Sequence, residues 1–272
     1  MIGKMVSQYL ILEELGRGSM GIVFKARDTV HGRLVALKII AEKLAHDPHM
    51  LRRFEREGAA ASGLRHPNIC TVYESGEWLG RPYLALELLS GRTLDHRLAN
   101  GPLPAATLLD VAIGVTSALE ATHAIGVIHR DIKPANLFLT TAGEVKVLDF
   151  GLAKVRQPQR AISPDSPTAA MYTTSRGLMV GTLAYMSLEQ IRSEPLDGRS
   201  DLYSLGVTLY ELGTGELPVQ GGKQAELPAG MGPIVAKLMA VDPAMRYQTA
   251  REAREAFESC KSRRRAFEHR AL

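Results

Sequence analysis

A short polar segment carries the residues best suited to chemistry. Residues 129–136 read His-Arg-Asp-Ile-Lys-Pro-Ala-Asn, with a carboxylate at Asp131, an ammonium at Lys133 and an amide at Asn136. Asp131 can orient a hydroxyl group and accept its proton, Lys133 can neutralise charge on a phosphate during transfer, and Asn136 can bind a metal ion. These groups, in this order, predict phosphoryl transfer to a hydroxyl.

A second acidic motif follows this segment. Asp149 opens Asp-Phe-Gly thirteen residues after Asn136, with short β-like runs at 137–139 and 145–148 between them. Mg²⁺ binds few carboxylates together with phosphate oxygens, so Asp149 can be a metal ligand that bridges phosphates. Asp-Phe-Gly alone is common by chance, but its position behind such a loop and hairpin is not.

Two motifs nearer the N-terminus carry groups that can face phosphates. Residues 16–23 fit G-x-G-x-x-G-x-V, which lets the backbone approach anionic oxygens, although a plain hairpin turn can hold the same glycines. Lys38 lies on an apolar run, where a buried ammonium needs an anionic partner, and Glu57, 19 residues later, can supply one. The glycines are Gly16, Gly18 and Gly21.

The elements that must position these motifs differ between two parts of the chain. Before residue 89, apolar runs bounded by turn signals predict antiparallel strands at 9–15, 22–26, 34–40, 71–77 and 82–87. Asp47-Pro48 predicts the start of a helix that ends near Ser62. Beyond Gly91, the sequence predicts helices at 103–124, 199–212, 234–240 and 249–258, and a polar loop at 155–180. We therefore expect an α+β chain of two lobes.

Composition narrows the class of protein. The 272 residues are 45% hydrophobic and 23% charged with a net charge of +4, which is typical of a globular protein and too weakly basic to indicate a nucleic-acid partner. The two cysteines, Cys70 and Cys260, lack metal-ligand spacing and indicate a reducing compartment. No signal peptide or membrane span is recognised, and 111–119 is interpreted as a buried helix. A cytoplasmic location is expected, either alone or as part of a membrane-anchored protein.

These motifs, in this order, resemble the eukaryotic-type (Hanks-type) serine/threonine protein kinase family, especially its bacterial members, from residue 9 to about 258. The resemblance implies a bilobal kinase fold with ATP in the cleft and Mg²⁺ or Mn²⁺ as the metal. It implies a five-stranded antiparallel N-lobe with one main helix (1–88), a mostly helical C-lobe (89–258) and a basic tail (259–272). It assigns catalysis to Asp131, Lys133, Lys38 and Glu57, and metal binding to Asn136 and Asp149.

The resemblance also implies how the nucleotide and the hydroxyl are chosen. Leu86 lies at the gatekeeper position, and Glu87 and Leu89 would bind adenine through backbone groups. Lys133, two residues after the catalytic aspartate, goes with Ser/Thr specificity in this family. The adenine ring would be sandwiched by Val23, Ala36 and Phe138. Phe is less usual than Leu or Met at the position of Phe138.

Supporting positions follow from the same resemblance. Thr182 resembles the threonine that contacts the catalytic Asp and Lys, and Asp201 resembles the aspartate that anchors the catalytic loop. Glu189 and Arg246 resemble the ion pair that closes the C-lobe. The assignment of Glu189 and Arg246 depends on the family match alone, and both can also be plain surface charges.

A long segment between two motifs suggests regulation. The stretch 149–189 spans 41 residues, and Arg130 resembles the arginine that receives a phosphate placed on this segment. We expect autophosphorylation, with self-association for transfer between copies, although a Ser/Thr-rich loop can also be merely solvated. The candidates are Thr168, Thr173, Thr174 and Ser175.

Two departures from the family pattern leave alternatives open. Leu188 replaces the usual proline before Glu189, and 215–233 is about one helix shorter than expected. The expected partners are ATP and proteins with Ser or Thr. The alternative is an ATP-binding pseudokinase that acts as a scaffold. A small-molecule phosphotransferase is disfavoured by Lys133 and Thr182.

The basic tail at 259–272 is expected to be solvated or, alternatively, to attract acidic lipid.

Overall fold

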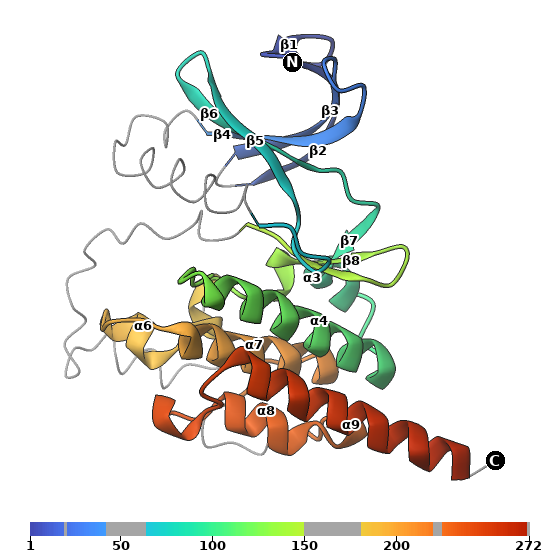
Figure 1. The fold of residues 1–272 in the computed structure, drawn as a ribbon, viewed down its shortest axis with the longest axis vertical. Coiled ribbons are helices and arrows are strands. Elements are labelled where there is room, and N and C mark those ends of the chain that lie inside the picture. The colour runs from blue at the N-terminus through green and yellow to red at the C-terminus, as the bar shows by residue number, and fades with distance from the viewer. Residues whose placement is uncertain (19–20, 42–63, 150–180, 220–224, 271–272) are drawn as a thin grey trace. The chain divides into compact units, whose positions relative to one another are not determined.

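The structure is a computed structural model that describes residues 1–18, 21–41, 64–149, 181–219 and 225–270. The chain divides into two compact units, which the ribbon in Figure 1 traces from blue to red. The N-terminal unit comprises Met1–Gly91 and Asp149–Val155, and the C-terminal unit comprises Arg92–Leu148 and Arg156–Leu272.

The N-terminal unit is built on an antiparallel sheet with strand order β1-β2-β3-β4-β6-β5. The five strands predicted from apolar runs are confirmed, and β1 is an added two-residue edge strand, too short for a sequence pattern to predict. The helix expected at 47–62 lies outside the described residues. The strands are β1 (Met5–Val6), β2 (Tyr9–Gly18), β3 (Gly21–Asp28), β4 (Leu34–Ile40), β5 (Val72–Trp78) and β6 (Arg81–Glu87).

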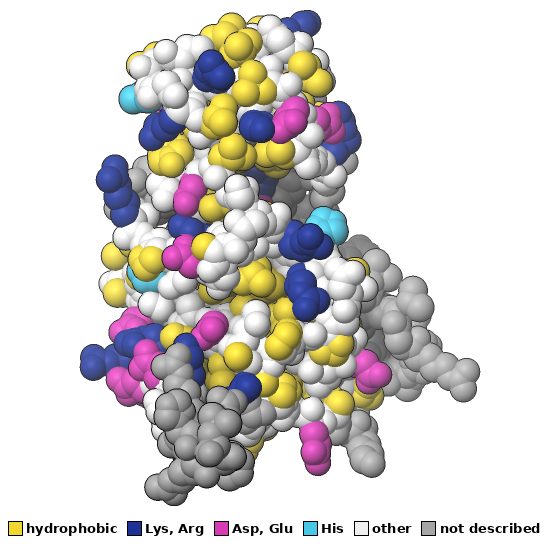
Figure 2. All heavy atoms as spheres, turned by 90° about the vertical axis from the view of Figure 1, so that its right-hand side faces the viewer, with side chains coloured by type: hydrophobic (Ala, Val, Ile, Leu, Met, Phe, Trp, Pro, Cys, Tyr) yellow, Lys and Arg dark blue, Asp and Glu magenta, His cyan; other side chains and the backbone are white. Residues whose placement is uncertain are grey.

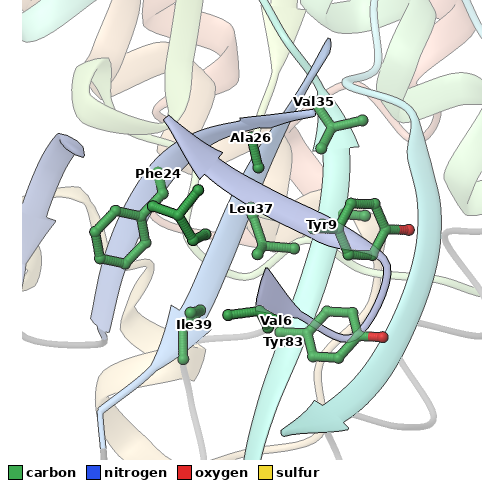
Figure 3. Close-up of a cluster of buried hydrophobic side chains, with 10 residues drawn as sticks. Val6, Tyr9, Phe24, Ala26, Val35, Leu37, Ile39 and Tyr83 are labelled. Atoms are coloured by element: carbon green, nitrogen blue, oxygen red, sulfur yellow. The ribbon is translucent and has the colours of Figure 1, made fainter. Parts of the chain in front are cut away.

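One face of this sheet forms the core of the unit. Alternate residues of β4 point into it, because successive side chains of a strand point to opposite faces. Figure 3 shows these side chains meeting others from β1, β2, β3 and β6. The rings of Tyr9 and Tyr83 meet edge to face at 5.8 Å, and both hydroxyls donate to Glu74, at 2.7 and 3.1 Å. The labelled residues are Val6, Tyr9, Phe24, Ala26, Val35, Leu37, Ile39 and Tyr83.

The C-terminal unit is mostly helical, with a small sheet of order β7-β8-β9. Helix α4 packs against α7 and α9, and α8 packs against α7 and α9 (Figure 1). The strands are β7 (Gly91–Thr93), β8 (Leu137–Thr140) and β9 (Val145–Val147). The helices are α3 (Leu94–Leu98), α4 (Ala105–Ala124), α6 (Leu188–Arg192), α7 (Gly198–Thr214), α8 (Gly232–Leu238) and α9 (Ala250–Arg270).

Helix α4 is the one helix in the described ranges that is long and apolar enough to cross a membrane. More than half of its apolar stretch, 56%, is buried inside the structure. Among its fully covered side chains are Leu108, Val115 and Leu119. A helix that is apolar on most sides is typical of the interior of a helical unit, so α4 serves as a core helix.

Helix α9 is longer than the sequence predicts. The predicted helix ended at 258, but α9 continues without a break to Arg270. Two ion pairs join it to α4: Arg254 Nε lies 3.0 Å from Glu120, and Lys261 pairs with Asp110. The basic segment therefore begins as an attached helix rather than as a separate tail.

On the face of the molecule shown in Figure 2, basic and acidic side chains lie interspersed with hydrophobic ones.

The stretch 215–233, which is shorter than the family pattern, follows α7 directly. Gly215 ends that helix with a left-handed backbone, φ +84°, a conformation that glycine adopts without steric cost. Between α7 and α8 the described residues hold one 3₁₀ turn, η3 (Pro228–Gly230), and no α-helix; 220–224 lie outside the description. The backbone N–H of Ala225 donates to the Tyr210 hydroxyl at 2.7 Å, which fastens the stretch to α7.

Candidate active site

The glycine-rich turn joins β2 and β3 in the N-terminal unit. Gly18 and Gly21 face each other across this hairpin, and residues 19–20 lie outside the described residues. A Cβ on Gly21 would collide with the carbonyl oxygen of Ile39 on β4, so only glycine fits there. A Cβ on Gly16 or Gly18 would meet nothing within 4 Å. The backbone is thus unobstructed at two of the three glycines.

The strand register gathers four predicted site residues on one face of the sheet. Lys38 pairs with Val23 on β3, and Ala36 pairs with Leu86 on β6. Residues directly opposite each other in an antiparallel pair point to the same face. The face that carries these residues is therefore opposite to the core face of β4, and Val23, Ala36 and Leu86 are only half-buried.

Lys38 and Asp149 form an ion pair within the N-terminal unit. The Lys38 Nζ donates to Asp149 Oδ2 at 2.6 Å, and Lys38 is only 6% exposed. A buried ammonium needs an anionic partner, and here the carboxylate of the Asp-Phe-Gly motif supplies it. Glu57, the partner predicted from sequence, lies outside the described residues. The two groups expected to face phosphate and metal thus contact each other.

In the C-terminal unit, one buried carboxylate anchors the backbone of residues 129–136. Asp201 on α7 is fully buried and accepts hydrogen bonds from the backbone N–H of His129 at 2.8 Å and of Arg130 at 2.7 Å. The ring Nε2 of His123, from the last turn of α4, also lies 2.8 Å from Asp201. This carboxylate therefore joins α4, α7 and the loop.

The carboxylate of Asp131 is held by two neighbours on the same loop. Its Oδ2 lies 2.9 Å from Lys133 Nζ and accepts from Asn136 Nδ2 at 2.9 Å. Asn136 Nδ2 also donates to the Asp131 carbonyl at 2.8 Å. Because the amide nitrogen faces Asp131, the amide oxygen of Asn136 is the atom that a metal ion could take. Asp131, Lys133 and Asn136 thus form one cluster.

The family of the chain follows from its match to known sequences. Residues 9–264 match the protein kinase domain family. The chain is a protein kinase domain. The match includes the glycine-rich turn, the Lys38 strand and the loop of Asp131, which are the parts that sequence reasoning singled out, and it extends into α9.

Relatives place the kinase domain among bacterial Hanks-type kinases. It is 40% identical to a probable serine/threonine-protein kinase of Streptomyces coelicolor over 94% of its length. It is 38% identical to serine/threonine-protein kinase PknB of Mycobacterium tuberculosis over 91% of its length. It spans about two fifths of those proteins, 40% and 42%. The crystal structure of the Mycobacterium tuberculosis PknI kinase domain is 26% identical with a TM-score of 0.76, and the match covers 96% of this chain and 99% of that one.

Glu189 and Arg246 of the kinase domain form the ion pair implied by the resemblance. Arg246 Nη1 and Nη2 donate to the two carboxylate oxygens at 2.7 and 3.1 Å, and Ser200 Oγ adds a bond at 2.8 Å. Burial raises the pKa of Glu189, but hydrogen bonds from Arg246, the backbone and Ser200 outweigh it and lower the pKa to about 2. The carboxylate therefore stays charged at all ordinary pH values.

The leucine that departs from the family pattern begins a well-capped helix. Leu188 is the first residue of α6, and Ser187 before it is the N-cap. Ser187 and Gln190 form a capping box, in which each side chain binds the other's backbone N–H. The cap fixes this turn even without the proline. Gln190 also donates from Nε2 to the Arg130 carbonyl at 2.9 Å.

Several predicted positions of the kinase domain are only partly described. Arg130 has a buried Nε with no hydrogen-bond partner in the described part of the chain. Thr182 lies in a 3₁₀ turn, η2 (Gly181–Tyr185), but its side chain is outside the description. The phosphorylation candidates Thr168, Thr173, Thr174 and Ser175 also lie outside the described residues. Half-buried positions are observed for Glu87 and Leu89 in the N-terminal unit and for Phe138 on β8.

Sequence reasoning missed two residues of the catalytic loop's surroundings. His123 was not singled out because a lone histidine at a helix end has no distinctive pattern. Gln190 could have been found, since Ser187 followed three residues later by glutamine is the sequence signature of a capping box. The contact of its amide with Arg130, 60 residues away, could not.

Proposed function

We propose that this kinase domain transfers the γ-phosphate of ATP to serine and threonine hydroxyls of proteins. The observation that carries the proposal is the Asp131 cluster, with its backbone anchored by the buried Asp201. The names of the relatives, which are serine/threonine-protein kinases, give the same acceptor class. Lys133, two residues after Asp131, supports Ser/Thr rather than Tyr as the acceptor.

Asp131 would do the acid–base work. Its carboxylate would accept a hydrogen bond from the substrate hydroxyl, align the oxygen for attack and take its proton as the bond to phosphorus forms. Lys133, 2.9 Å from Asp131 in the free domain, would turn its ammonium to the transferring phosphate. Asn136 would keep the carboxylate in place through its amide nitrogen.

The residues present fit a divalent metal and ATP. Asn136 offers an amide oxygen and Asp149 a carboxylate, and Mg²⁺ takes a few such oxygens together with phosphate oxygens. Mg²⁺, or Mn²⁺ in its place, would neutralise charge on the phosphates when bound. Lys38 would exchange its ion pair with Asp149 for the α- and β-phosphates, with Glu57 as its partner. Gly16, Gly18 and Gly21 would cover the phosphates with backbone N–H groups.

Adenine would lie against the half-buried face of the sheet. Val23 and Ala36 are apolar and share that face with Lys38, so the ring and the phosphates would lie along one surface. Leu86 would limit the depth of the site as gatekeeper. The backbone of Glu87 and Leu89 would bind the ring edge, and Phe138 would cover its other side.

Phosphorylation between residues 168 and 175 would regulate the domain. Arg130, whose buried Nε has no hydrogen-bond partner among the described residues, supports a role as phosphate receptor, because Arg–phosphate pairs are strong and bidentate. Transfer between two copies would supply the phosphate. Mass spectrometry after incubation with Mg-ATP is expected to find it at Thr168, Thr173, Thr174 or Ser175, and an unmodified stretch would contradict this part of the proposal.

The domain would act in the cytoplasm on protein substrates. Kinases of this family meet ATP there, and the longer relatives leave room for further regions in the whole protein, a membrane anchor among them. The basic end of α9 would add weak attraction to acidic lipid. Co-sedimentation with acidic liposomes, with and without residues 259–272, tests that attraction.

Radiolabelled ATP tests the main proposal. Wild type is expected to label itself and a basic test protein, whereas Asp131→Asn and Lys38→Met are expected to lose transfer about 10²- to 10⁴-fold. Transfer that persists undiminished in both variants would contradict the assigned mechanism. If wild type binds ATP but labels no more than Asp131→Asn, the scaffold alternative holds instead.

A further inference from the structure

One peptide bond sets the direction of Asp131, and it is the bond between Arg130 and Asp131. Arg130 has φ +68°, a left-handed backbone that is uncommon for a residue other than glycine. Such a conformation persists only where its surroundings hold it. The contacts that hold this peptide therefore help to place Asp131, whose carboxylate is also held by Lys133 and Asn136.

Hydrogen bonds reach this peptide at both of its polar groups. The N–H of Asp131 donates to Nδ1 of His129 at 3.2 Å. The carbonyl of Arg130 accepts from Nε2 of Gln190 at 2.9 Å. Asp201 holds the two preceding N–H groups but does not touch this peptide's oxygen. Among the described residues, Gln190 is thus the contact that fixes the carbonyl side of this peptide.

The amide of Gln190 has two separate tasks. Its Oε1 accepts from the Ser187 backbone N–H at 3.0 Å and completes the cap of α6. Capping uses only that oxygen, and glutamate serves equally well at this position of a capping box. The nitrogen, which a glutamate lacks, is the group that meets Arg130. The cap alone therefore does not account for an amide at this position.

We propose that Gln190 is a positioning residue for catalysis, which holds the Arg130–Asp131 peptide through its amide nitrogen. The inference deepens the proposed function, on which it rests. Gln190 follows Glu189, the last residue of the 149–189 segment, so the end of that segment is joined through one side chain to the peptide of the proposed base. Release of that end would free the Arg130 carbonyl.

Gln190→Glu separates the two tasks. The variant keeps an oxygen for the Ser187 N–H and so keeps the cap, but at neutral pH it presents a carboxylate oxygen to the Arg130 carbonyl. We expect kcat to fall about 10- to 100-fold, with KM for ATP within about twofold, because small misplacement of a reacting group costs that much. Ser187→Ala is the matched control, since it weakens the same cap and leaves the amide nitrogen in place.

The pH profile distinguishes a hydrogen-bond donor from mere packing. The carboxyl group introduced by Gln190→Glu regains a donor when it is protonated, so the ratio of kcat in this variant to kcat in wild type should rise as pH falls from 8 to 5.5. Glu189, the adjacent acid, has a pKa of about 2 and does not titrate in this range. His123 and His129 make the same contacts around the loop in both proteins, so their contribution cancels in the ratio.

Hydrogen exchange of the Asp131 amide gives a second readout that needs no activity. It should be faster in Gln190→Glu than in Ser187→Ala. Equal kcat in wild type and Gln190→Glu, or a reduced but pH-independent ratio, would overturn the inference while the proposed function stands. If wild type transfers no phosphate, the proposed function fails, and exchange alone decides whether Gln190 holds this peptide.

Discussion

In the N-terminal unit, Lys38 projects from the middle of a regular strand, whereas in the C-terminal unit Asp131 lies on a loop between helix and strand. The strand is held by backbone pairing with β3 and β6, which does not depend on the lysine side chain. The loop is held by side chains of Asp201 and Gln190 that bind its backbone. In the N-terminal unit, the residue proposed for catalysis is therefore not one that holds the backbone in place. In the C-terminal unit, the side chains that fix the catalytic loop also contribute to stability.

This difference between the two units can be measured as the effect of substitutions on stability and on turnover. Buried polar groups cost free energy when a partner is lost, because the remaining group cannot reach water. In the C-terminal unit, substitutions near the site should lower both stability and turnover. In the N-terminal unit, the site lysine should affect turnover alone, whereas backbone crowding should affect stability.

The largest expected effect on stability is at the ion pair of the C-terminal unit. Arg246→Ala leaves the buried Glu189 carboxylate without its partner, and we expect a loss of about 3–5 kcal/mol in the free energy of unfolding. Urea denaturation measures it. Arg251→Ala, which breaks the exposed pair with Glu255, is the control and should cost less than about 1 kcal/mol. Similar losses in both variants would contradict the assigned burial.

The same pair predicts how stability depends on pH. Glu189 has a pKa of about 2 in the folded protein against 4.5 as its ordinary value, so it binds its proton more weakly when folded. Its contribution, about 3 kcal/mol, is complete above pH 4.5 and is lost as pH falls from there to about 2. The difference in unfolding free energy between wild type and Arg246→Ala should therefore shrink over this range. A difference that is unchanged at pH 3 would argue against a lowered pKa.

Asp201→Asn tests whether the loop anchor serves both stability and activity. An amide keeps one acceptor but turns an N–H₂ toward either His129 or Arg130, so one backbone N–H loses its partner. We expect a loss of about 1–3 kcal/mol and a clear fall in kcat. Chemical denaturation and transfer assays on the same preparation measure both. Unchanged kcat with reduced stability would separate the anchor from catalysis.

Gly21→Ala tests crowding in the N-terminal unit. The new methyl group would meet the carbonyl oxygen of Ile39, so β3 and β4 must shift, at a cost of about 1–2 kcal/mol. Gly18→Ala is the stability control, because its methyl group meets nothing within 4 Å. Thermal unfolding of the two variants compares them. Equal midpoints would mean that the strands at Gly21 are not as close as described.

The smallest effect on stability is expected at Lys38. Lys38→Met removes a buried charge and leaves Asp149, whose side chain is 25% exposed, able to meet water. The free energy of unfolding should change by less than about 1 kcal/mol while phosphate transfer is lost. Denaturation and ATP-transfer assays together test this. A loss of several kcal/mol would remove the contrast between the two units.

The two units also differ in how far sequence predicts them. Apolar runs predicted β2 to β6 because each strand buries one face, whereas Val23, Ala36 and Leu86 were assigned to the nucleotide site by the family resemblance. In the loop, the residue types at 129–136 predicted a site, but the contacts that hold it come from α4, α6 and α7. Such long-range contacts leave no local pattern, which is why His123 and the second contact of Gln190 were missed.

Helix α9 shows a different limit. The residues after 258 are compatible with a helix, but their basic composition suggested a solvated tail. The helix nevertheless continues, since Cys260 is buried and Lys261 pairs with Asp110 on α4. The basic composition of this segment reflects the residues that face water. A few residues that face the rest of the unit are enough to extend the helix.

The buried carboxylate on α7 has a consequence for synthesis of the protein. Asp201 is 72 residues beyond His129, so the loop leaves the ribosome well before its anchor does. At typical elongation rates of about 5–20 residues per second, this delay is about 4 to 14 seconds. During that time the nascent chain holds the base without the group that fixes its backbone. The proposed base therefore reaches its final position only after α7 has been made.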